Sequence, residues 1–205
     1  MNKTMKIILA TNNKNKLREM REITSGLDIE IISQSDAGIS IDPEETGSTF
    51  AENAYIKAKA ALDASGLPAI ADDSGLCVDA LGGEPGVYSA RYGPGKNATD
   101  RDKYLYLLDK LKGEKNRKAR FVCSVCCLFP NGDRLSAEDS LEGSIQYAPT
   151  GANGFGYDPV FVPDGYTRSN AELTPEEKNA ISHRGKATRA IVLKLKEYLE
   201  NGNNK

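Results

Sequence analysis

Apolar and polar positions along this 205-residue chain alternate between short strand-like runs and longer helix-like stretches. A continuous apolar run at residues 6–10 predicts a buried strand, and residues 30–33 predict a second one. Between them, apolar residues from Leu17 to Leu27 recur at helical spacing, and Gly26 is a typical stop signal. This order of strand, helix and strand is typical of an α/β protein.

Three further helices carry recognisable start signals. Thr49 and Glu52 stand at the spacing of a capping box, ahead of an alanine-rich apolar face. Thr99 is a good N-cap for a helix with leucines on one face, and Thr174 precedes a proline suited to the first helical position. A last helix is predicted after residue 182.

A hairpin is predicted in the second half of the chain. Residues 119–129 are strongly strand-like, and Asn131-Gly132 is a preferred hairpin pair. Residues 133–144 are therefore expected to return antiparallel. The segment at 114–118 is rich in charge and predicts a surface loop.

Composition excludes several classes of protein. The formal net charge of −2 argues against general nucleic-acid binding. There is no apolar run long enough for a membrane span and no signal-peptide pattern, so we expect a cytoplasmic protein without a membrane partner. No linker-like stretch divides the chain, so we expect a single domain over residues 1–205.

The cysteines and the histidine narrow the chemistry further. Cys123 and Cys126 form a Cys-x-x-Cys pair, but no second pair completes a four-ligand zinc site. We interpret them, with Cys127, as core-filling side chains. His183 is the single histidine, which excludes catalysis by a multi-histidine zinc site.

The run at 69–76 holds the most informative polar residues. A short apolar strand is predicted to end at Asp72 and Asp73, followed by Ser74 and Gly75. Neighbouring side chains of a strand point to opposite faces, so the two carboxylates are not expected to face one cleft together unless the chain turns there. Carboxylates at a strand end suit a hard cation such as magnesium, whereas the alternative is a plain polar turn.

An acidic loop at 42–47 could contribute to the same chemistry. Glu44 and Glu45 either complete a metal site with Asp73 or form a solvated loop. The sequence leaves both interpretations open.

Two other segments are compatible with a nucleotide. Residues 11–16 link a strand to a helix, where free N–H groups and Lys16 suit a phosphate; the alternative is an asparagine-rich cap with solvated lysines. In the glycine-rich segment at 149–161, Phe155 and Tyr157 offer faces on which a purine could stack, although a simple aromatic turn explains it equally well. Lys178, in the first turn of a helix, opposes the helix dipole and invites a functional explanation.

Together, these motifs identify a resemblance. The chain closely resembles the Ham1/inosine triphosphate pyrophosphatase family, including its bacterial dITP/XTP pyrophosphatases. The resemblance rests on Thr-x-Asn-x-x-Lys at 11–16, on 49–54 with Lys57, and on the blocks at 71–76, 85–92, 154–159 and 182–185. Asn12 is a departure, since bacterial members often have glycine there.

The resemblance implies a fold, an activity and a cofactor. The fold is α/β, with a mixed central sheet and flanking helices in two lobes around a cleft. The activity is magnesium-dependent hydrolysis of ITP, dITP and XTP to the monophosphate and pyrophosphate, which removes deaminated purines from the nucleotide pool. The resemblance also implies a homodimer.

The resemblance further implies roles for individual residues. Asp73 is the general base and a Mg²⁺ ligand, and Glu44 is the preferred second ligand, with Glu45 as the alternative. The residues implied to bind phosphate are Thr11, Asn12, Asn13, Lys14, Asn15 and Lys16. Those implied to contact the rest of the nucleotide are Ser74, Phe155, Gly156, Tyr157, Asp158, Lys178, His183 and Arg184. A binding protein without catalysis and an enzyme for pyrimidine nucleotides are the competing hypotheses.

Overall fold

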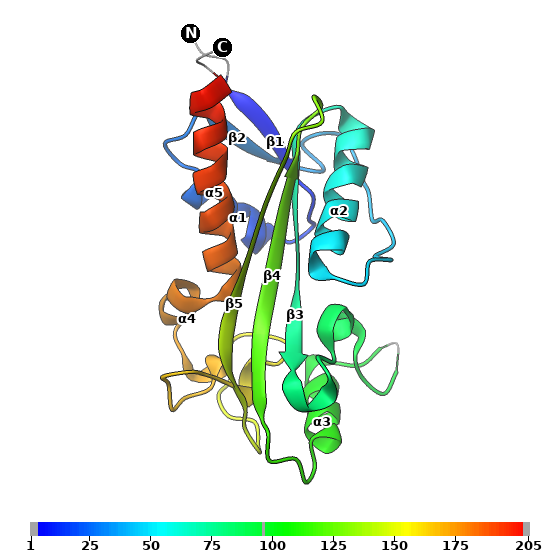
Figure 1. Ribbon diagram of the computed structural model, residues 1–205, viewed down its shortest axis with the longest axis vertical. Coiled ribbons are helices and arrows are strands. Elements are labelled where there is room, and N and C mark those ends of the chain that lie inside the picture. Colours follow the sequence, from blue (N-terminus) through cyan, green and yellow to red (C-terminus); the bar gives the residue numbers. More distant parts are fainter. Residues whose placement is uncertain (1–3, 96, 203–205) are drawn as a thin grey trace. The chain divides into compact units, whose positions relative to one another are not determined.

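The computed structural model describes residues 4–95 and 97–202, and it contains a six-stranded sheet in the order β2-β1-β3-β4-β5-β6 (Figure 1). The strands are β1 (Met5–Leu9), β2 (Ile29–Ser33), β3 (Ala69–Val78), β4 (Lys118–Leu128), β5 (Arg134–Ile145) and β6 (Phe161–Pro163). The α-helices are α1 (Lys14–Ile23), α2 (Phe50–Ser65), α3 (Asp100–Lys110), α4 (Pro175–Ile181) and α5 (His183–Gly202). Short 3₁₀ segments are η1 (Asp79–Leu81), η2 (Gly86–Arg91), η3 (Asp158–Val160) and η4 (Asn170–Glu172).

The sheet is mixed, as the resemblance implied. Strand β1 pairs in parallel with both β2 and β3, whereas β5 pairs antiparallel with β6. Strands β1 and β2 are joined through α1, which is the order that the apolar pattern predicted. Helices accompany the strands along the chain, so the α/β class is confirmed.

The chain divides into two compact units. Unit 1 comprises Met1–Asp73, Ser124–Glu138 and Ala187–Lys205, and unit 2 comprises Ser74–Cys123 and Asp139–Lys186. Strands β3, β4 and β5 and helix α5 contribute residues to both units. In the sequence, the first of the four changes between units falls between Asp73 and Ser74. The single domain over residues 1–205 and the cleft stay predictions.

In unit 1, helix α2 packs through small side chains. Ala54 and Ala58 form a buried cluster with Ala71 of β3 and Leu128 of β4, which matches the place of α2 (cyan) in Figure 1. Because alanine has no side chain beyond Cβ, the helix backbone approaches the strands closely. The predicted capping box starts α2 at Thr49.

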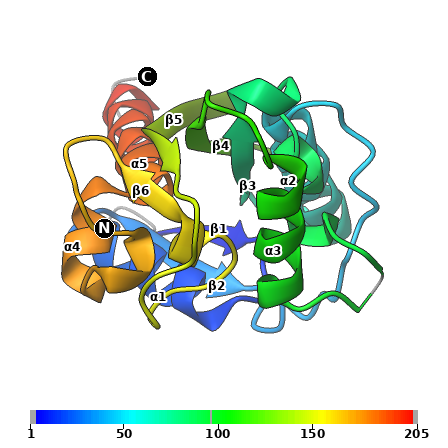
Figure 2. The ribbon, with the colours of Figure 1, turned by 90° about the horizontal axis from the view of Figure 1, so that it is seen from below.

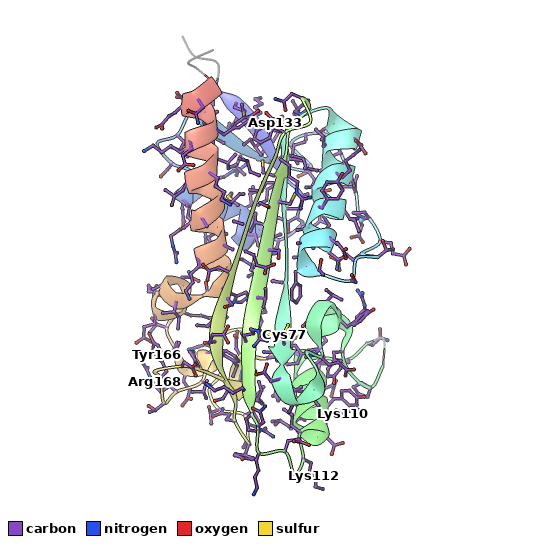
Figure 3. The ribbon with its side chains drawn as sticks, viewed as in Figure 1. Cys77, Lys110, Lys112, Asp133, Tyr166 and Arg168 are labelled. Carbon is purple, nitrogen blue, oxygen red and sulfur yellow. The ribbon has the colours of Figure 1, made fainter. Side chains whose placement is uncertain are left out.

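The hairpin end of unit 1 is fixed by helix α5. The N–H of Phe129 donates to the carbonyl oxygen of Asp133 at 3.0 Å, which closes the hairpin predicted at Asn131-Gly132. Figure 3 shows Asp133 at the turn between β4 and β5. Tyr198 of α5 stacks on Phe129 at 4.2 Å between ring centroids and donates its hydroxyl to Asp133 at 2.8 Å.

Unit 2 has an apolar core of its own. Phe121 of β4 and Phe161 of β6 meet edge to face at 4.7 Å between centroids, and Figure 2 shows β6 beside β5. Leu107 of α3 and its C-cap residue Leu111 lie in this core and are fully buried. The predicted N-cap of α3, Thr99, is confirmed together with a capping box.

The cysteines behave as core residues. Cys123, Cys126 and Cys127 are at most 1% exposed, which confirms the core-filling interpretation, and the four cysteines are free thiols rather than disulfides. Burial raises the pKa of the Cys126 thiol, so this side chain stays protonated and unreactive at neutral pH. None of the helices in the described ranges combines the length and the apolar character needed to cross a bilayer.

The prediction that the third strand ends at the carboxylates is wrong. Strand β3 continues to Val78, so Asp72 and Asp73 lie in its middle. Leu76 and Val78 resume the apolar alternation and are 0% exposed. Their burial in unit 2 favours an extended chain over a turn at Gly75.

The prediction that residues 114–118 form a charged surface loop is wrong for Arg117. Its side chain is buried and donates to the carbonyl oxygens of Leu111, Ile145 and Gln146, each at 2.9 Å. The guanidinium also lies over the ring of Tyr147 at 4.6 Å. Arg117 thus ties the C-terminal end of α3 to the end of β5, because its fork of donors serves several carbonyls at once.

We expect Arg117→Ala to lower the free energy of unfolding by about 3 kcal/mol, since the charged donor is lost and buried carbonyls stay unpaired. Urea denaturation measures this loss. The matched control is Lys115→Ala, an exposed cation of the same loop, which should change stability by less than about 0.5 kcal/mol. Equal losses in both variants would contradict the anchoring role of Arg117.

Candidate active site

The two adjacent carboxylates of β3 have different partners. Lys16 of α1 places its Nζ at 2.7 and 2.6 Å from the two carboxylate oxygens of Asp72. Both side chains are largely buried, at 21% and 10% exposure. Asp73 is held by another lysine, as expected when successive strand residues point to opposite faces.

Asp73 is the centre of a cluster within unit 1. Its carboxylate accepts a hydrogen bond from Lys57 Nζ at 2.9 Å and from Asn53 Nδ2 at 3.3 Å. Lys57 Nζ also donates to Glu45 Oε1 at 2.8 Å, and the Asn53 amide oxygen accepts the N–H of Gly47. Asn53 and Lys57 are four residues apart, so α2 presents both on one face. We call Glu45, Asn53, Lys57 and Asp73 the acidic cluster.

Burial sets the charge properties of the acidic cluster. It raises the pKa of Asp73, and the charge of Lys57 offsets this only in part while Glu45 adds to it. Burial also opposes the ammonium form of Lys57, but the neighbouring Asp73 and Glu45 outweigh it, so the pKa of Lys57 is raised. With both carboxylates ionised the cluster carries one net negative charge, which favours a further cation.

The acidic cluster offers carboxylate oxygens, the type of ligand that magnesium takes in proteins. Asp73 Oδ1 and Glu45 Oε1 both lie within 2.9 Å of Lys57 Nζ. Two carboxylate oxygens therefore face one positive charge. Across residues 4–95 and 97–202, no three or more His, Cys, Asp or Glu side chains gather as a metal site. Magnesium suits such a site because it keeps several waters and takes few protein ligands besides substrate phosphates.

The two glutamates of the acidic loop differ in their surroundings. Glu45 is engaged by Lys57 inside the acidic cluster, with its side chain 28% exposed. Glu44, the preferred metal ligand from the sequence, is exposed and forms no ion pair or hydrogen bond with any described residue. Its carboxylate is therefore available to a cation.

The loop before α1 is a helix cap as well as a candidate phosphate site. The Asn13 side chain accepts the N–H of Lys16 at 3.3 Å, and the N–H of Asn13 donates to the hydroxyl of Thr11 at 3.2 Å. Lys14 is exposed, and the side chain of Asn15 lies outside what the structure describes. The capping interpretation is thus confirmed for Asn13, and it leaves the loop N–H groups oriented at a helix start.

A cavity of about 150 Å³ joins this loop to β3. Thr11, Asn12 and Lys16 line it together with Lys57 and Asp72. The structure therefore brings three predicted phosphate residues beside a second lysine. The role of Lys57 was missed by sequence reasoning, although its place four residues after Asn53 in a capped helix was a usable signal.

In unit 2, Asp158 organises the aromatic loop, which we define as residues 153–158. Its buried carboxylate accepts the N–H of Phe155 at 2.8 Å, Lys178 Nζ at 2.5 Å and Asn170 Nδ2 at 3.2 Å. Since these protein donors surround both oxygens, Asp158 holds the loop and Lys178 in fixed positions. Asn170 was missed by sequence reasoning, because nothing local marks it.

Phe155 is an exposed aromatic face with two cations beside it. Its side chain is 61% exposed, Lys178 Nζ lies 4.6 Å from the ring centroid, and the Arg184 guanidinium lies 6.0 Å from it. Arg184 also donates to the hydroxyl of Ser74 at 3.1 Å. The structure therefore gathers these four predicted residues, and they offer a stacking surface with hydrogen-bond donors at its edge.

The surroundings of Tyr157 differ from those expected, and those of His183 are aromatic. The Tyr157 ring is 4% exposed and its hydroxyl donates to the carbonyl oxygen of Ser89 at 2.9 Å, so the idea that this ring offers a stacking face is wrong. Burial of Tyr157 is favoured because its hydroxyl has a hydrogen-bond partner and its ring packs in the apolar core of unit 2. His183 stacks on Phe121 at 5.0 Å between centroids and begins α5.

We expect Gly154→Ala to destabilise the protein more than Gly165→Ala does. Both glycines have a left-handed φ, +77° and +83°, which costs a residue with a Cβ about 1 kcal/mol. At position 154 the Cβ would also lie 2.2 Å from Asp158 Oδ2, whereas at 165 no atom lies within 4 Å. Urea denaturation should show roughly 1 kcal/mol or more of additional loss for Gly154→Ala, because the hydrogen bonds of Asp158 have to shift. Equal losses would mean that the contact with Asp158 is unimportant.

Comparison with known proteins gives a consistent result. The sequence model of the Ham1 family matches residues 7–194. A dITP/XTP pyrophosphatase from Deinococcus deserti is 50% identical over 197 residues, covering 96% of this chain and 92% of that protein. One from Streptomyces avermitilis is 50% identical over 199 residues and covers 95% and 98% of the two chains.

Solved structures agree with the sequence comparison. A HAM1 protein from Coxiella burnetii has a TM-score of 0.90 and 46% identity, covering 94% of this chain and 99% of that one. The Ham1 protein of Staphylococcus aureus has a TM-score of 0.85 and 40% identity, with 96% and 99% covered. The resemblance inferred from the motifs is thus confirmed, and the chain belongs to the Ham1 family.

Proposed function

We propose that this chain hydrolyses the non-canonical purine nucleoside triphosphates ITP, dITP and XTP to the monophosphate and pyrophosphate. The observation that carries the proposal is the acidic cluster, in which Lys57 bridges the buried Asp73 and Glu45 of the acidic loop. Relatives at 50% identity over nearly the whole chain are named dITP/XTP pyrophosphatases, which supports the same reaction here.

Magnesium is the proposed cofactor, with Asp73 and Glu44 as its protein ligands. When bound, the ion lowers the pKa of a coordinated water and offsets the charge of the phosphates. Glu44 is preferred to Glu45 because its exposed carboxylate forms no ion pair or hydrogen bond with any described residue. In this assignment Glu45 and Lys57 orient Asp73.

Asp73 is the proposed general base. Its carboxylate takes a proton from the attacking water, whose oxygen bonds to the α-phosphorus while the bond to the β-phosphate oxygen breaks. Lys16 and Lys57, which line one cavity with Thr11, are placed to stabilise charge on the phosphates and on the departing pyrophosphate. Thr11, Asn12, Asn13 and the loop N–H groups bind the phosphate chain.

The base of the nucleotide is assigned to unit 2. A purine stacks on Phe155, and Lys178 and Arg184 donate to acceptors at its edge. A 6-keto oxygen accepts such hydrogen bonds, whereas the 6-amino group of adenine would leave the donors unpaired. His183 and Ser74 complete the proposed contacts, and Asp158 acts through the loop and Lys178.

The assembly and location follow from the family resemblance. We propose a homodimer in the cytoplasm that acts on free nucleotides and not on nucleic acid. The formal net charge of −2 supports the exclusion of nucleic acid, since such binding normally requires a basic surface.

The proposed reaction is tested by pyrophosphate release from ITP, dITP, XTP, GTP, ATP and dTTP, each with and without Mg²⁺. We expect release from ITP, dITP and XTP at least about a hundredfold above that from ATP, because unpaired buried donors discriminate strongly. Omission of Mg²⁺ should abolish it. Preference for dTTP would support a pyrimidine enzyme, and binding without any turnover would support a binding protein.

The roles of the carboxylates are tested with matched variants. Asp73→Asn should lower kcat with dITP by roughly a hundredfold or more, since general-base catalysis contributes that much. Asp63→Asn, which alters an exposed carboxylate of helix α2, should leave kcat unchanged.

Glu44→Gln and Glu45→Gln then separate the two glutamates. We expect Glu44→Gln to raise the Mg²⁺ concentration needed for half-maximal rate more than Glu45→Gln does, because only a direct ligand changes metal affinity strongly. The reverse order would assign the metal to Glu45.

A further inference from the structure

We propose that Asp100, the first residue of α3, is a positioning residue that fixes the aromatic loop by accepting the N–H of Gly156. This inference rests on the proposed function, in which a purine stacks on Phe155. It adds a determinant of base binding that lies 55 residues before Phe155 in the sequence and acts through the loop backbone.

The contact is short and specific. Asp100 Oδ2 accepts the N–H of Gly156 at 2.7 Å, the range of charge-assisted hydrogen bonds. Gly156 has a left-handed φ of +62°, which sets the direction in which its N–H points. The backbone N–H of Phe155 goes to Asp158 at 2.8 Å. Two successive N–H groups of the aromatic loop are thus held by two carboxylates, one within the loop and one from α3.

Helix α3 does not require Asp100 for its own start. Thr99 is the N-cap, and Asp102 forms the reciprocal capping box with it. Asp100 bonds outside the helix to Gly156, and its other oxygen receives Lys103 at 3.2 Å. The hydrogen bond from Gly156 is also the largest factor that lowers the pKa of Asp100, so the carboxylate stays ionised at neutral pH.

Phe155 depends on such anchors because its own ring is poorly packed. The ring is 61% exposed, so its position follows the backbone on either side. On the C-terminal side, Tyr157 is fixed by its buried ring and its hydrogen bond to Ser89. Asp100 acts at the residue between them. Its loss frees the peptide next to the stacking ring while the core below stays intact.

Another explanation is that Asp100 merely adds favourable charge at a helix N-terminus. Asp102 provides the matched control, since it lies in the same turn, carries the same charge and bonds only within the cap among the interactions given by the described residues. A dipole effect would be similar for both, whereas an effect on base binding belongs to Asp100 alone.

The experiment compares Asp100→Ala, Asp100→Asn and Asp102→Asn in the full chain. KM and kcat are measured for dITP with Mg²⁺, and amide hydrogen exchange is measured over residues 153–158 without nucleotide. We expect Asp100→Ala to raise KM roughly three- to tenfold, the effect of one lost hydrogen bond, with a smaller change in kcat and faster exchange in the loop. Asp100→Asn should raise KM less than Asp100→Ala does, because its amide oxygen can still accept the N–H of Gly156. Asp102→Asn should lower the thermal midpoint and leave KM unchanged.

Wild-type KM and exchange in Asp100→Ala would overturn the inference, and so would an equal rise of KM in Asp102→Asn. If the wild-type protein did not hydrolyse dITP, the proposed function would fail instead. The exchange measurement would still show whether Asp100 holds the loop, so the two failures are distinguishable.

Discussion

The structure of unit 1 depends on keeping an ionised carboxylate, Asp73, in a mostly buried position. Removing such a charge from water costs several kcal/mol, unless partners replace the lost hydration. Lys57 and Asn53 supply that replacement from one face of α2. Their reach requires the helix to lie close to β3, and the alanines at 54 and 58 allow this because they add no bulk at the contact. The close packing of α2 against β3 is therefore required to stabilise the charge of Asp73.

Unit 2 uses a buried carboxylate in a different way. Asp158 is surrounded by donors from the aromatic loop, α4 and η4, and it holds Lys178 beside the exposed ring of Phe155. One oxygen of Asp73 accepts only a long hydrogen bond from Asn53, at 3.3 Å, whereas both oxygens of Asp158 accept hydrogen bonds from protein donors. One carboxylate is thus suited to reacting groups and the other to fixing the shape of a loop.

The pairing of lysines with carboxylates bears on how a protein with a net charge of −2 can bind a highly charged anion. Lys16, Lys57 and Lys178 are each held by a carboxylate at 2.5 to 2.9 Å. These pairs orient the ammonium groups in advance, so less freedom is lost when a phosphate or a keto oxygen arrives. In the proposed function, local placement of these cations, rather than a basic surface, provides the positive charge.

The sequence by itself determined the local structure: the caps at Thr49, Thr99 and Thr174, the hairpin turn, and the order of strands and helices. These features depend on hydrogen bonds between residues a few positions apart, which a local pattern records. The family motifs also singled out Asp73, Lys16, Phe155 and Arg184 as candidate site residues before any geometry was known. The tertiary structure decided which distant groups meet. The partnership of Lys57 with Asp73, the burial of Arg117 and Tyr157, and the continuation of β3 past its carboxylates all follow from packing between segments far apart in the chain. No local pattern encodes those contacts, because their free energy comes from burial and from partners that only the fold brings together.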